Sequence, residues 1–524
     1  MTTVATATSF PFIPLLLAIP LVAAAVVIAI PKEKSAIARW VGLGSSFVTL
    51  GLAIAMGIAF DKNMAGYQFV SSHSWASSLG ISWISGVDGI SLFMVGLTAL
   101  IVPIALLGAN EVHRTRAYVA WMLVLETACI GSFVSLDLIL FFLFFELTLI
   151  PSYFLITGWG GPKRAAAATK FFVFTFTGSA FLLIGFLYVA YSHNREFHTW
   201  TFSLVNLIGT RYSGVAGILI LVAMTFAFAI KAPLFPFHTW SPDTYGEAPA
   251  GASMVLSAVL AKLGAYGIIR FDLSLVPHAA KVAAPVLLTL AVISIIYGSI
   301  VACAQNDLKR LIAYSSLAQL GFIILGTFAL STQGLTGAVF LMLSHGIITA
   351  AFFLLVGWIA QRRGTWQLSE LKGLQGPAPV LAGAFTIVMV ASIGLPGLAG
   401  FVGEYLILLG TFVTHVWWAV IATLGVLLSA IYFLWAYQQS FQGKAEGKNS
   451  TVRDLTFGER AIIAPLIILI VLLGVFPKPV LERIEPSVNA TLQEITVANC
   501  PHGLLCVAPA PGLHVSSSSQ GGSK

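Results

Sequence analysis

The strongest constraint on the fold is a series of apolar stretches, each long enough to cross a lipid bilayer. A membrane-spanning helix needs about 20 mainly apolar residues, and about fourteen stretches of this chain meet that requirement. Their approximate ranges are 12–30, 37–60, 88–109, 117–135, 138–157, 167–191, 215–242, 249–270, 281–303, 309–330, 335–360, 379–410, 416–440 and 461–476. The sequence therefore predicts an all-α polytopic membrane protein. Residues 1–476 form one transmembrane domain, and residues 477–524 form a polar C-terminal tail.

The amino-acid composition agrees with this class. Of the 524 residues, 58% are hydrophobic and 9% are charged, whereas soluble domains carry roughly 25% charged residues. The formal net charge is +7, but the basic residues lie in small clusters between apolar stretches rather than along one face. Such clusters reflect membrane topology and argue against nucleic-acid binding. The sequence also has no Walker loop and no glycine-rich nucleotide motif after a strand.

Basic residues between the spans predict the orientation of the chain. Most of the 27 lysines and arginines follow odd-numbered spans. Because such residues stay on the cytoplasmic side, we expect the loops after odd-numbered spans inside and both termini outside. The N-terminal stretch lacks the basic region of a signal peptide, so we expect residues 10–30 to be retained as the first transmembrane helix.

Two of the spans are interrupted by helix-breaking residues. The seventh contains "FAIKAPLFPFHTWSPD", in which Pro233 and Pro236 remove backbone donors. The twelfth contains "VASIGLPGLAGFVGEYLIL", with a Gly/Pro cluster before Glu404. Because the breaks lie five spans apart, we predict two five-helix repeats, spans 4–8 (residues 117–270) and spans 9–13 (residues 281–440). An odd number of spans per repeat requires the second to be inverted, as in transporters.

Ionisable side chains inside the spans are the main candidates for function. In "FFLFFELTLIP", residues 141–151, one carboxylate stands among apolar side chains. The full set comprises Glu126, Glu146, Lys231, Lys262 and Glu404, with His238 and His345 beside them. A charge at the bilayer centre costs roughly 2.5–3.5 kcal/mol on insertion scales. These residues therefore need partners, a function, or both.

Two interpretations of these charges are open. In the first, Glu146 and Lys231 form an ion pair that only holds two helices together. In the second, the charges form a proton relay. Burial favours the neutral form of a lysine and a nearby carboxylate favours its charged form, so moving or protonating Glu146 changes the proton affinity of Lys231. We favour the relay, because a buried pair is weak evidence for stability and leaves Lys262 and Glu404 unexplained.

The two histidines carry weaker signals, since a histidine on an apolar helix is more often a core residue than a relay member. His345 lies in "LSHGIITAA", whose small residues leave room for water. We therefore include it in the relay beside Lys262. His238 follows the break in the seventh span and is a candidate gate.

Glu126 lies in the fourth span, close in sequence to Thr127 and Ser132. We expect its carboxyl group to be neutral and hydrogen-bonded there. Its role in the relay is then a supporting one.

The four cysteines do not form a metal or redox motif. Cys129 and Cys303 lie alone in apolar stretches and are expected to be small core residues. No Cys-x-x-Cys spacing is present, so no iron–sulfur cluster is predicted. Cys500 and Cys506, in "CPHGLLC", lie on the side expected to be outside. The sequence leaves open whether these two cysteines form a disulfide or are free thiols.

Five long motifs resemble those of a known family. They are "FFELTLIPSYFLITGWGG", "IKAPLFPFHTWSPD…EAP", "DLKRLIAYSSLAQLGF", "LSHGIITAAFFLLVG" and "GLPGLAGFVGEYLIL". In content and order they are similar to the antiporter-like subunits of respiratory complex I, from the third span to the thirteenth. That family also includes subunits of multisubunit Na⁺/H⁺ antiporters.

The resemblance implies roles for individual residues. In the family a Glu on helix 5 pairs with a Lys on helix 7, which matches Glu146 and Lys231. A central Lys on helix 8 matches Lys262. The last ionisable residue, on the broken helix 12, is Glu in M-type subunits and usually Lys in L-type, N-type and antiporter relatives. Glu404 therefore makes the chain similar to the M-type subunits.

The resemblance also implies a function and partners. The expected function is proton translocation as a membrane subunit of complex I in the bacterial plasma membrane, between L- and N-type subunits. No cofactor is expected on this chain, whereas NADH, FMN, iron–sulfur clusters and quinone are expected on partner subunits. Two alternatives stay open: a subunit of an Na⁺/H⁺ antiporter, which Glu404 argues against, and a passive scaffold between neighbouring pumps.

Two positions depart from the family pattern. Relatives often have His where this chain has Gln319, in "SSLAQLGF", and where it has Tyr245, in "PDTYGEAP". Neither a glutamine nor an ordinary tyrosine titrates near neutral pH. A proton path through these two side chains is therefore not expected here unless water substitutes for them.

Overall fold

Helices make up nearly all of the described part of the chain, residues 10–108 and 115–498 of the computed structural model. Within those residues, thirteen helical stretches are long and apolar enough to cross a membrane. The helices are α1 (Phe12–Ala29), α2 (Ser35–Ala59), α3 (Ser91–Gly108), α4 (Thr115–Val134), α5 (Leu138–Leu147), α6 (Leu149–Trp159), α7 (Arg164–Phe197), α8 (Leu204–Leu207), α9 (Gly214–Lys231), α10 (Trp240–Glu247), α14 (Pro277–Cys303), α15 (Leu308–Phe328), α16 (Thr332–Arg363), α17 (Pro379–Ile393), α18 (Ala399–Thr414), α19 (Val416–Phe441), α20 (Phe457–Val475) and α21 (Lys478–Ala498). Short 3-10 turns lie at Lys32–Lys34, Ser77–Leu79, Leu368–Glu370 and Gly447–Asn449.

The predicted all-α membrane fold is confirmed by this architecture. Each predicted span coincides with one of the long helical stretches, except the twelfth. The twelfth predicted span, residues 379–410, is divided between the shorter apolar helices α17 and α18. The possible disulfide between Cys500 and Cys506 lies outside the described residues and stays a prediction.

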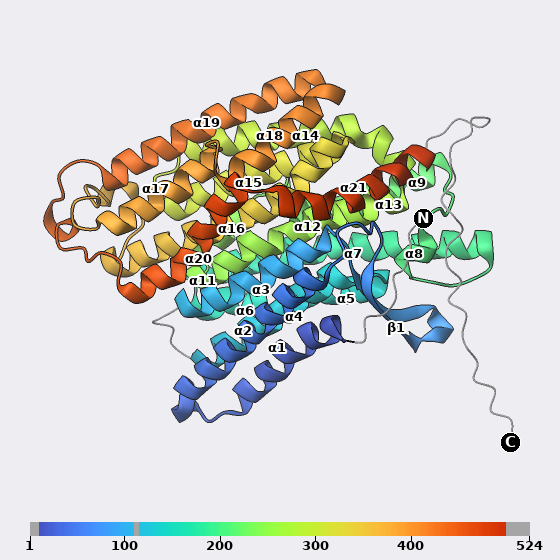
Figure 1. Cartoon of the computed structure of the whole chain (residues 1–524), viewed down its shortest axis with the longest axis horizontal. Coiled ribbons are helices and arrows are strands. Elements are labelled where there is room, and N and C mark those ends of the chain that lie inside the picture. Colours follow the sequence, from blue (N-terminus) through green and yellow to red (C-terminus); the bar gives the residue numbers. More distant parts are fainter. Residues whose placement is uncertain (1–9, 109–114, 499–524) are drawn as a thin grey trace.

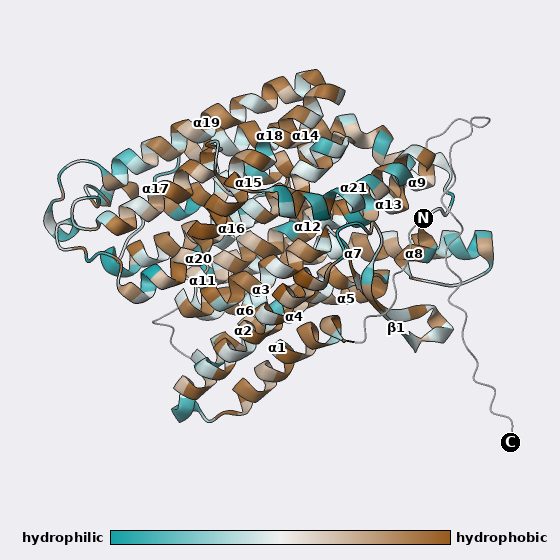
Figure 2. Ribbon diagram, viewed as in Figure 1, coloured by the Kyte–Doolittle hydropathy of each residue, from teal (hydrophilic) through white to brown (hydrophobic). Residues whose placement is uncertain are grey.

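The helices lie side by side in one bundle (Figure 1). A β-hairpin and α8 lie at the right-hand end in this view, and we name that end of the bundle the hairpin end. The loop between α19 and α20 lies at the opposite end. Figure 2 shows hydrophobic residues along the helices and hydrophilic residues gathered in the loops and on α21, as expected for a membrane bundle.

The β-hairpin is a feature that the sequence did not predict. Strands β1 (Gln68–Ala76) and β2 (Ile81–Val87) pair antiparallel between α2 and α3. The turn passes through Gly80, whose φ of 71° lies in the left-handed region that glycine adopts readily. The Asp137 side chain, which also caps α5, accepts a hydrogen bond from the Ser82 backbone N–H at 3.1 Å. The hairpin is thus tied to the bundle.

Both predicted helix breaks are present. The seventh span is divided into α9 and α10, and the residues between them include Pro233 and Pro236. The twelfth is divided into α17 and α18, and the break begins at Gly394 with a φ of 85°. The predicted inverted relation between residues 117–270 and 281–440 stays a prediction.

The eighth span departs from a regular α-helix. It consists of α11 (Ala250–Val255), η3 (Leu256–Leu260), α12 (Ala261–Gly267), η4 (Ile268–Asp272) and α13 (Leu273–Leu275), where η3 and η4 are π-helical turns. Its most apolar stretch is fully buried in the bundle. π-Helical turns are rare and occur frequently at functional sites.

The polar segment expected after residue 476 begins with an amphipathic helix, α21. Its buried apolar residues recur at helical spacing and are Val480, Ile484, Val488 and Ile495. The Ser487 hydroxyl accepts a hydrogen bond from the Gly89 backbone N–H at 3.0 Å, just before α3. Thr332, at the start of α16, donates to Asn489 at 3.0 Å. The helix α21 therefore connects the ends of α3 and α16 at the hairpin end.

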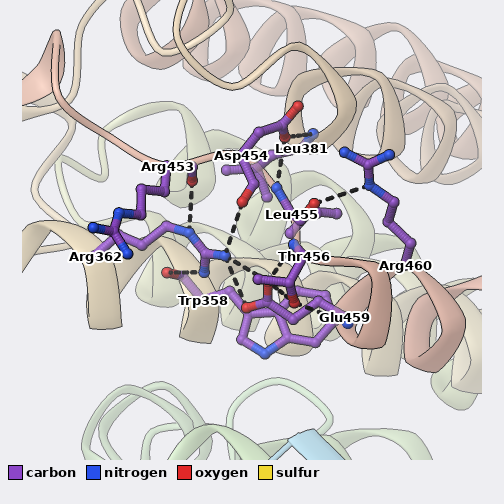
Figure 3. A network of polar contacts seen from close by, with 9 residues as sticks. All are labelled: Trp358, Arg362, Leu381, Arg453, Asp454, Leu455, Thr456, Glu459 and Arg460. Carbon is purple, nitrogen blue, oxygen red and sulfur yellow. Dashed lines mark hydrogen bonds and ion pairs between the residues drawn. The ribbon is translucent and has the colours of Figure 1, made fainter.

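A polar network joins three helix ends at the opposite end of the bundle (Figure 3). The Arg362 guanidinium of α16 donates to both carboxylate oxygens of Glu459 at 2.8 and 2.7 Å. Thr456 and Glu459 form a capping box that begins α20. Bonds of this kind, between charged groups, are about twice as strong as neutral ones.

Asp454 extends this network to α17. Its carboxylate accepts hydrogen bonds from the backbone N–H groups of Val380 and Leu381, both at 2.9 Å, in the first turn of that helix. Burial alone would raise the pKa of Asp454, but these N–H groups and that of Leu455 hold it below its usual range. A helix N-terminus favours a negative charge for the same reason.

Replacing Gly403 by alanine tests the close packing of α18 against α16. A Cβ atom at this position would lie 2.8 Å from the Leu341 Cβ atom and 3.0 Å from its Cα atom. Since overpacking costs about 1–3 kcal/mol, we expect Gly403→Ala to lower the temperature at which the purified subunit unfolds. Gly383→Ala is the control, because a Cβ atom there meets nothing within 4 Å. Equal unfolding temperatures for both variants would contradict the predicted packing.

Candidate functional site

Lys231 lies at the end of α9, where the seventh span breaks. It is buried, and its Nζ atom donates a hydrogen bond to the Thr148 hydroxyl at 2.8 Å. The same ammonium lies 4.5 Å from the centre of the Phe145 ring, a distance at which a cation is attracted by an aromatic face. The junction of α5 and α6 therefore supplies the immediate environment of this charge.

Glu146 lies on α5 and is half-buried. No ion pair within 4.0 Å joins it to Lys231 among the described residues. Its carboxylate interacts with the Ser179 hydroxyl of α7 and with the more distant charge of Lys231. Thr148 thus contacts the lysine directly, and the predicted charge pairing of Glu146 with Lys231 acts across a longer distance.

Lys262 and His345 come together at the centre of the bundle. The Lys262 Nζ atom lies 3.0 Å from the His345 Nδ1 atom and donates to the Ser257 carbonyl at 2.7 Å. In a regular α-helix that carbonyl would accept from Ala261, but in η3 the Ala261 N–H donates to Leu256 instead. The π-helical turn therefore leaves a carbonyl oxygen free for the lysine.

The glycine that follows His345 allows this approach. A Cβ atom on Gly346 would lie 2.5 Å from a Leu97 side-chain carbon of α3 and 3.0 Å from the Ala258 carbonyl of η3. Only a residue without a side chain permits α16 to pack this closely against η3. The neighbouring histidine is thereby placed beside the lysine.

Glu404 lies on α18, just beyond the break in the twelfth span, and is 4% exposed. Its Oε1 atom accepts a hydrogen bond from the Gln319 amide at 2.7 Å. The same amide nitrogen lies 3.5 Å from the Ser392 carbonyl of α17. Gln319, one of the two departures from the family pattern, is therefore a direct partner of the predicted terminal residue.

Helix α15 connects the central pair with Glu404. The hydroxyl groups of Ser257 and Ser316 lie 3.2 Å apart. Ser316 and Gln319 are three residues apart on α15 and therefore lie on one face. Ser257 and Ser316 were not predicted as site residues. For Ser316 a signal was present, since it precedes Gln319 by three residues within "AYSSLAQ", whereas Ser257 lies alone among apolar residues in "MVLSAVL".

Glu126 contradicts one expectation. It is fully buried on α4, but neither of its carboxylate oxygens has a hydrogen-bond partner among the described residues. Thr127 and Ser132 instead donate to the carbonyl groups of Leu123 and Ala128, four residues earlier. Serine and threonine hydroxyls within helices commonly bond in this way, so the predicted hydrogen bonds of Glu126 were wrong.

His238 and Tyr245 lie away from the contacts described above. His238 lies in the break between α9 and α10, with its ring 5.7 Å from that of Phe235 and 5.1 Å from that of Tyr297. Tyr245 is fully buried on α10 and packs against Phe353 of α16, with ring centres 6.1 Å apart. Neither the His238 Nδ1 atom nor the Tyr245 hydroxyl has a hydrogen-bond partner in the described part of the chain.

Further buried charged groups, among them Arg270 and Asp272, were missed because they lie close to the ends of predicted spans. Arg270, the last residue of the predicted eighth span, is buried in η4 and forms an ion pair with Asp88 at 2.6 Å. Asp272, also in η4, is fully buried and accepts a hydrogen bond from Thr225 of α9 at 2.6 Å. The predicted set of ionisable residues inside the spans was therefore incomplete.

The arrangement suits the binding and release of protons. Lysines, a histidine and carboxylates lie inside the bundle, and hydroxyl and amide groups form hydrogen bonds with some of them. Within residues 10–108 and 115–498, no group of three or more His, Cys, Asp or Glu side chains is placed to hold a metal ion. The chemistry supported by these side chains themselves is acid–base chemistry.

Replacing Gln319 by leucine tests its contact with Glu404. The variant removes the amide that donates to the Glu404 Oε1 atom. Because a hydrogen bond lowers the stretching frequency of a carboxyl C=O group, we expect the Glu404 band to move to higher frequency in infrared difference spectra. Gln375→Leu, at an exposed loop position, is the control. An unchanged band in Gln319→Leu would show that the contact is absent in solution.

Comparison with known proteins gives the family. A family model described as NADH:quinone oxidoreductase/Mrp antiporter, TM, matches residues 135–431. NADH-quinone oxidoreductase subunit M of Mycobacterium tuberculosis is 36% identical over 549 residues, which cover 98% of this chain and 99% of the relative. The subunit M of Rhodobacter capsulatus is 41% identical over 489 residues, covering 91% and 95% of the two chains.

Solved structures agree with this result. A chain of respiratory complex I from Thermus thermophilus is 30% identical and matches with a TM-score of 0.84, over 92% of this chain and 99% of that chain. A chain of the Mrp complex from Dietzia sp. shares the fold, with a TM-score of 0.81 over 93% of this chain and 100% of that chain, at 21% identity. The chain therefore belongs to the family of NADH-quinone oxidoreductase subunit M, the antiporter-like membrane subunits of respiratory complex I.

Proposed function

We propose that this subunit moves protons across the membrane through Glu146, Lys231, Lys262, His345 and Glu404, with Glu126 in a supporting role and His238 as a gate. The observation that carries the proposal is the contact between Lys262 and His345, 3.0 Å apart at the centre of the bundle. Two basic groups this close disfavour carrying positive charge at the same time. A proton that arrives on one of them therefore favours release from the other.

The direction of transfer follows from the order of the groups. Glu146 acts on the charge of Lys231, and a change in its protonation alters how tightly Lys231 holds a proton. The proton then passes to Lys262 and His345, and from there along Ser316 and Gln319 of α15 to Glu404. Gln319 does not titrate, so its amide orients Glu404, and water carries the proton past it.

The setting of this transfer is the membrane arm of complex I. We infer that L- and N-type antiporter-like subunits flank this chain in the bacterial plasma membrane. Electron transfer from NADH through FMN and iron–sulfur clusters to quinone belongs to partner subunits. The distribution of basic residues supports a topology in which both termini and the hairpin end lie outside.

Two other functions make different predictions. An Na⁺/H⁺ antiporter subunit has the same fold, as the Mrp chain from Dietzia sp. illustrates, but Glu404 and the similarity to subunit M relatives favour complex I. A passive scaffold would join neighbouring pumps without using its buried charges. The variants below separate the scaffold from the pump.

Glu146→Gln and Lys262→Ala test the relay in the intact complex, reconstituted into vesicles. Both variants remove a group that titrates, so we expect the protons moved by this subunit to fall by a factor of about 10² or more, while the complex still assembles. Glu146→Asp should retain part of the activity. Lys281→Ala, at an exposed position of α14, is the control. Normal pumping by assembled Lys262→Ala would favour the scaffold.

Two substitutions of Glu404 test its role as the last group of the relay. Glu404→Gln keeps the size and the hydrogen-bonding capacity of the side chain but cannot bind and release a proton, so pumping should fall while the fold is kept. Glu404→Lys introduces a group that still titrates and should retain more activity. If Glu404→Gln pumped like the wild type and Glu404→Lys were inactive, Glu404 would be a structural anchor only.

A further inference from the structure

A row of polar side chains leads from Lys262 toward the hairpin end. Lys262, Tyr266 and Arg270 follow one another at intervals of four residues, so they lie on successive turns of nearly the same helix face. The Arg270 Nε atom donates to the Tyr266 hydroxyl at 3.2 Å. That hydroxyl donates to the Phe133 carbonyl of α4 at 2.9 Å. The proposed relay uses Lys262 but neither Tyr266 nor Arg270.

Arg270 is already neutralised by one carboxylate. Its Nη2 atom lies 2.6 Å from an Asp88 carboxylate oxygen, and its Nη1 atom donates to the Tyr67 hydroxyl at 2.8 Å. The other Asp88 oxygen accepts from the backbone N–H groups of Ile90 and Ser91 at 3.1 and 2.9 Å. The ion pair between Asp88 and Arg270 is therefore fixed on both sides.

Glu494 of α21 is a second carboxylate that interacts electrostatically with the same guanidinium. It is half-buried and interacts with the Ser274 hydroxyl and with the charge of Arg270. Its Oε2 atom is buried and has no hydrogen-bond partner among the described residues. Because two carboxylates interact with one cation, the cluster is most stable when it also holds one proton.

The surroundings of Glu494 set its proton affinity near neutrality. Burial raises the pKa of Glu494 to about 7, although the Ser274 hydroxyl and the Arg270 charge act in the opposite direction. The other titratable groups of the cluster within the described residues are Asp88, Arg270, Tyr67 and Tyr266. Burial raises the pKa of Tyr67 above its usual range, so this hydroxyl stays neutral near pH 7. Glu494 is therefore the group of this cluster whose charge changes near pH 7.

We propose that Glu494 is a proton-release group at the hairpin end, supplied from Lys262 along the face that carries Tyr266 and Arg270. The inference rests on the proposed proton translocation and adds to the path through Glu404 a second path, which branches from it at Lys262. A proton leaves the Lys262 ammonium and travels through water along this face. It binds the Glu494 Oε2 atom to give a neutral carboxyl group, which then loses it to water outside. Arg270 stays charged throughout and positions both carboxylates.

The test is proton pumping per NADH oxidised by the intact complex in vesicles, at a series of pH values on the side of the hairpin end. Below about pH 7 the wild-type Glu494 carboxyl stays protonated and cannot accept the next proton, so pumping should fall with a midpoint near 7. In Glu494→Gln we expect pumping at neutral pH to be several-fold lower and this midpoint to be absent. In Ser274→Ala the midpoint should move to higher pH, because a hydroxyl that lowers the pKa of Glu494 is lost.

Glu485→Gln is the matched control, because Glu485 lies on the same helix and is exposed. If Glu494 were only a structural anchor, the glutamine in Glu494→Gln would keep its hydrogen bonding. The variant would then show neither the loss of pumping nor the loss of the midpoint. Glu494→Gln with the pumping and pH profile of the wild type would overturn the proposal, whatever its effect on assembly. If Glu494→Gln behaved like the wild type while Lys262→Ala were inactive in the same assay, the proposed function would stand and only the exit through Glu494 would fail.

Discussion

The ammonium group of Lys262, at the centre of a fully buried helix, imposes a requirement on everything packed around it. An unpaired charge in such a place is among the costliest groups a membrane protein can contain. The chain meets this requirement with a backbone carbonyl left free by η3 and with the imidazole of His345. Both partners depend on close packing, since η3 is a local distortion and His345 is placed by the glycine that follows it.

A side-chain charge of opposite sign stabilises the end of the half-helix α10. Helix α10 ends near Gly246 and Ala248, and the buried Lys309 ammonium donates to both of their carbonyl groups, at 3.1 and 2.5 Å. Asp243 on the same helix pairs with Lys170 of α7 at 2.8 Å. A cation at a helix C-terminus interacts favourably with the helix dipole. The second half of the broken seventh span, α10, is therefore held at its C-terminal end, while Lys231 lies at the end of the first half, α9, where the span breaks.

Much of this architecture was readable in the sequence, because bilayer thickness sets the length of a span and proline and glycine mark the breaks. The predicted relay residues were identifiable for a related reason, since a charge in an apolar stretch is conspicuous. Ser257, Ser316 and Thr148 were not, because a hydroxyl in a helix usually bonds to its own backbone. Arg270 and Asp88 were missed because each lies close to a span boundary, where a charge is unremarkable. The hairpin and α21 lie outside the apolar stretches, so the signal used to find the spans did not apply to them.

The two π-helical turns of the eighth span have a consequence for how this chain tolerates changes in length. A π-helical turn holds one residue more than the α-helical turn it replaces, so η3 and η4 are equivalent to two single-residue insertions. The wider turn absorbs the extra residue, so the helix parts before and after η3 keep their faces. Removing one residue from η3 would restore a regular α-helix, in which every carbonyl accepts from the backbone N–H four residues later. The chain could therefore lose a residue here without rotating α11 against α12, but Lys262 would lose the carbonyl oxygen that η3 leaves free for it.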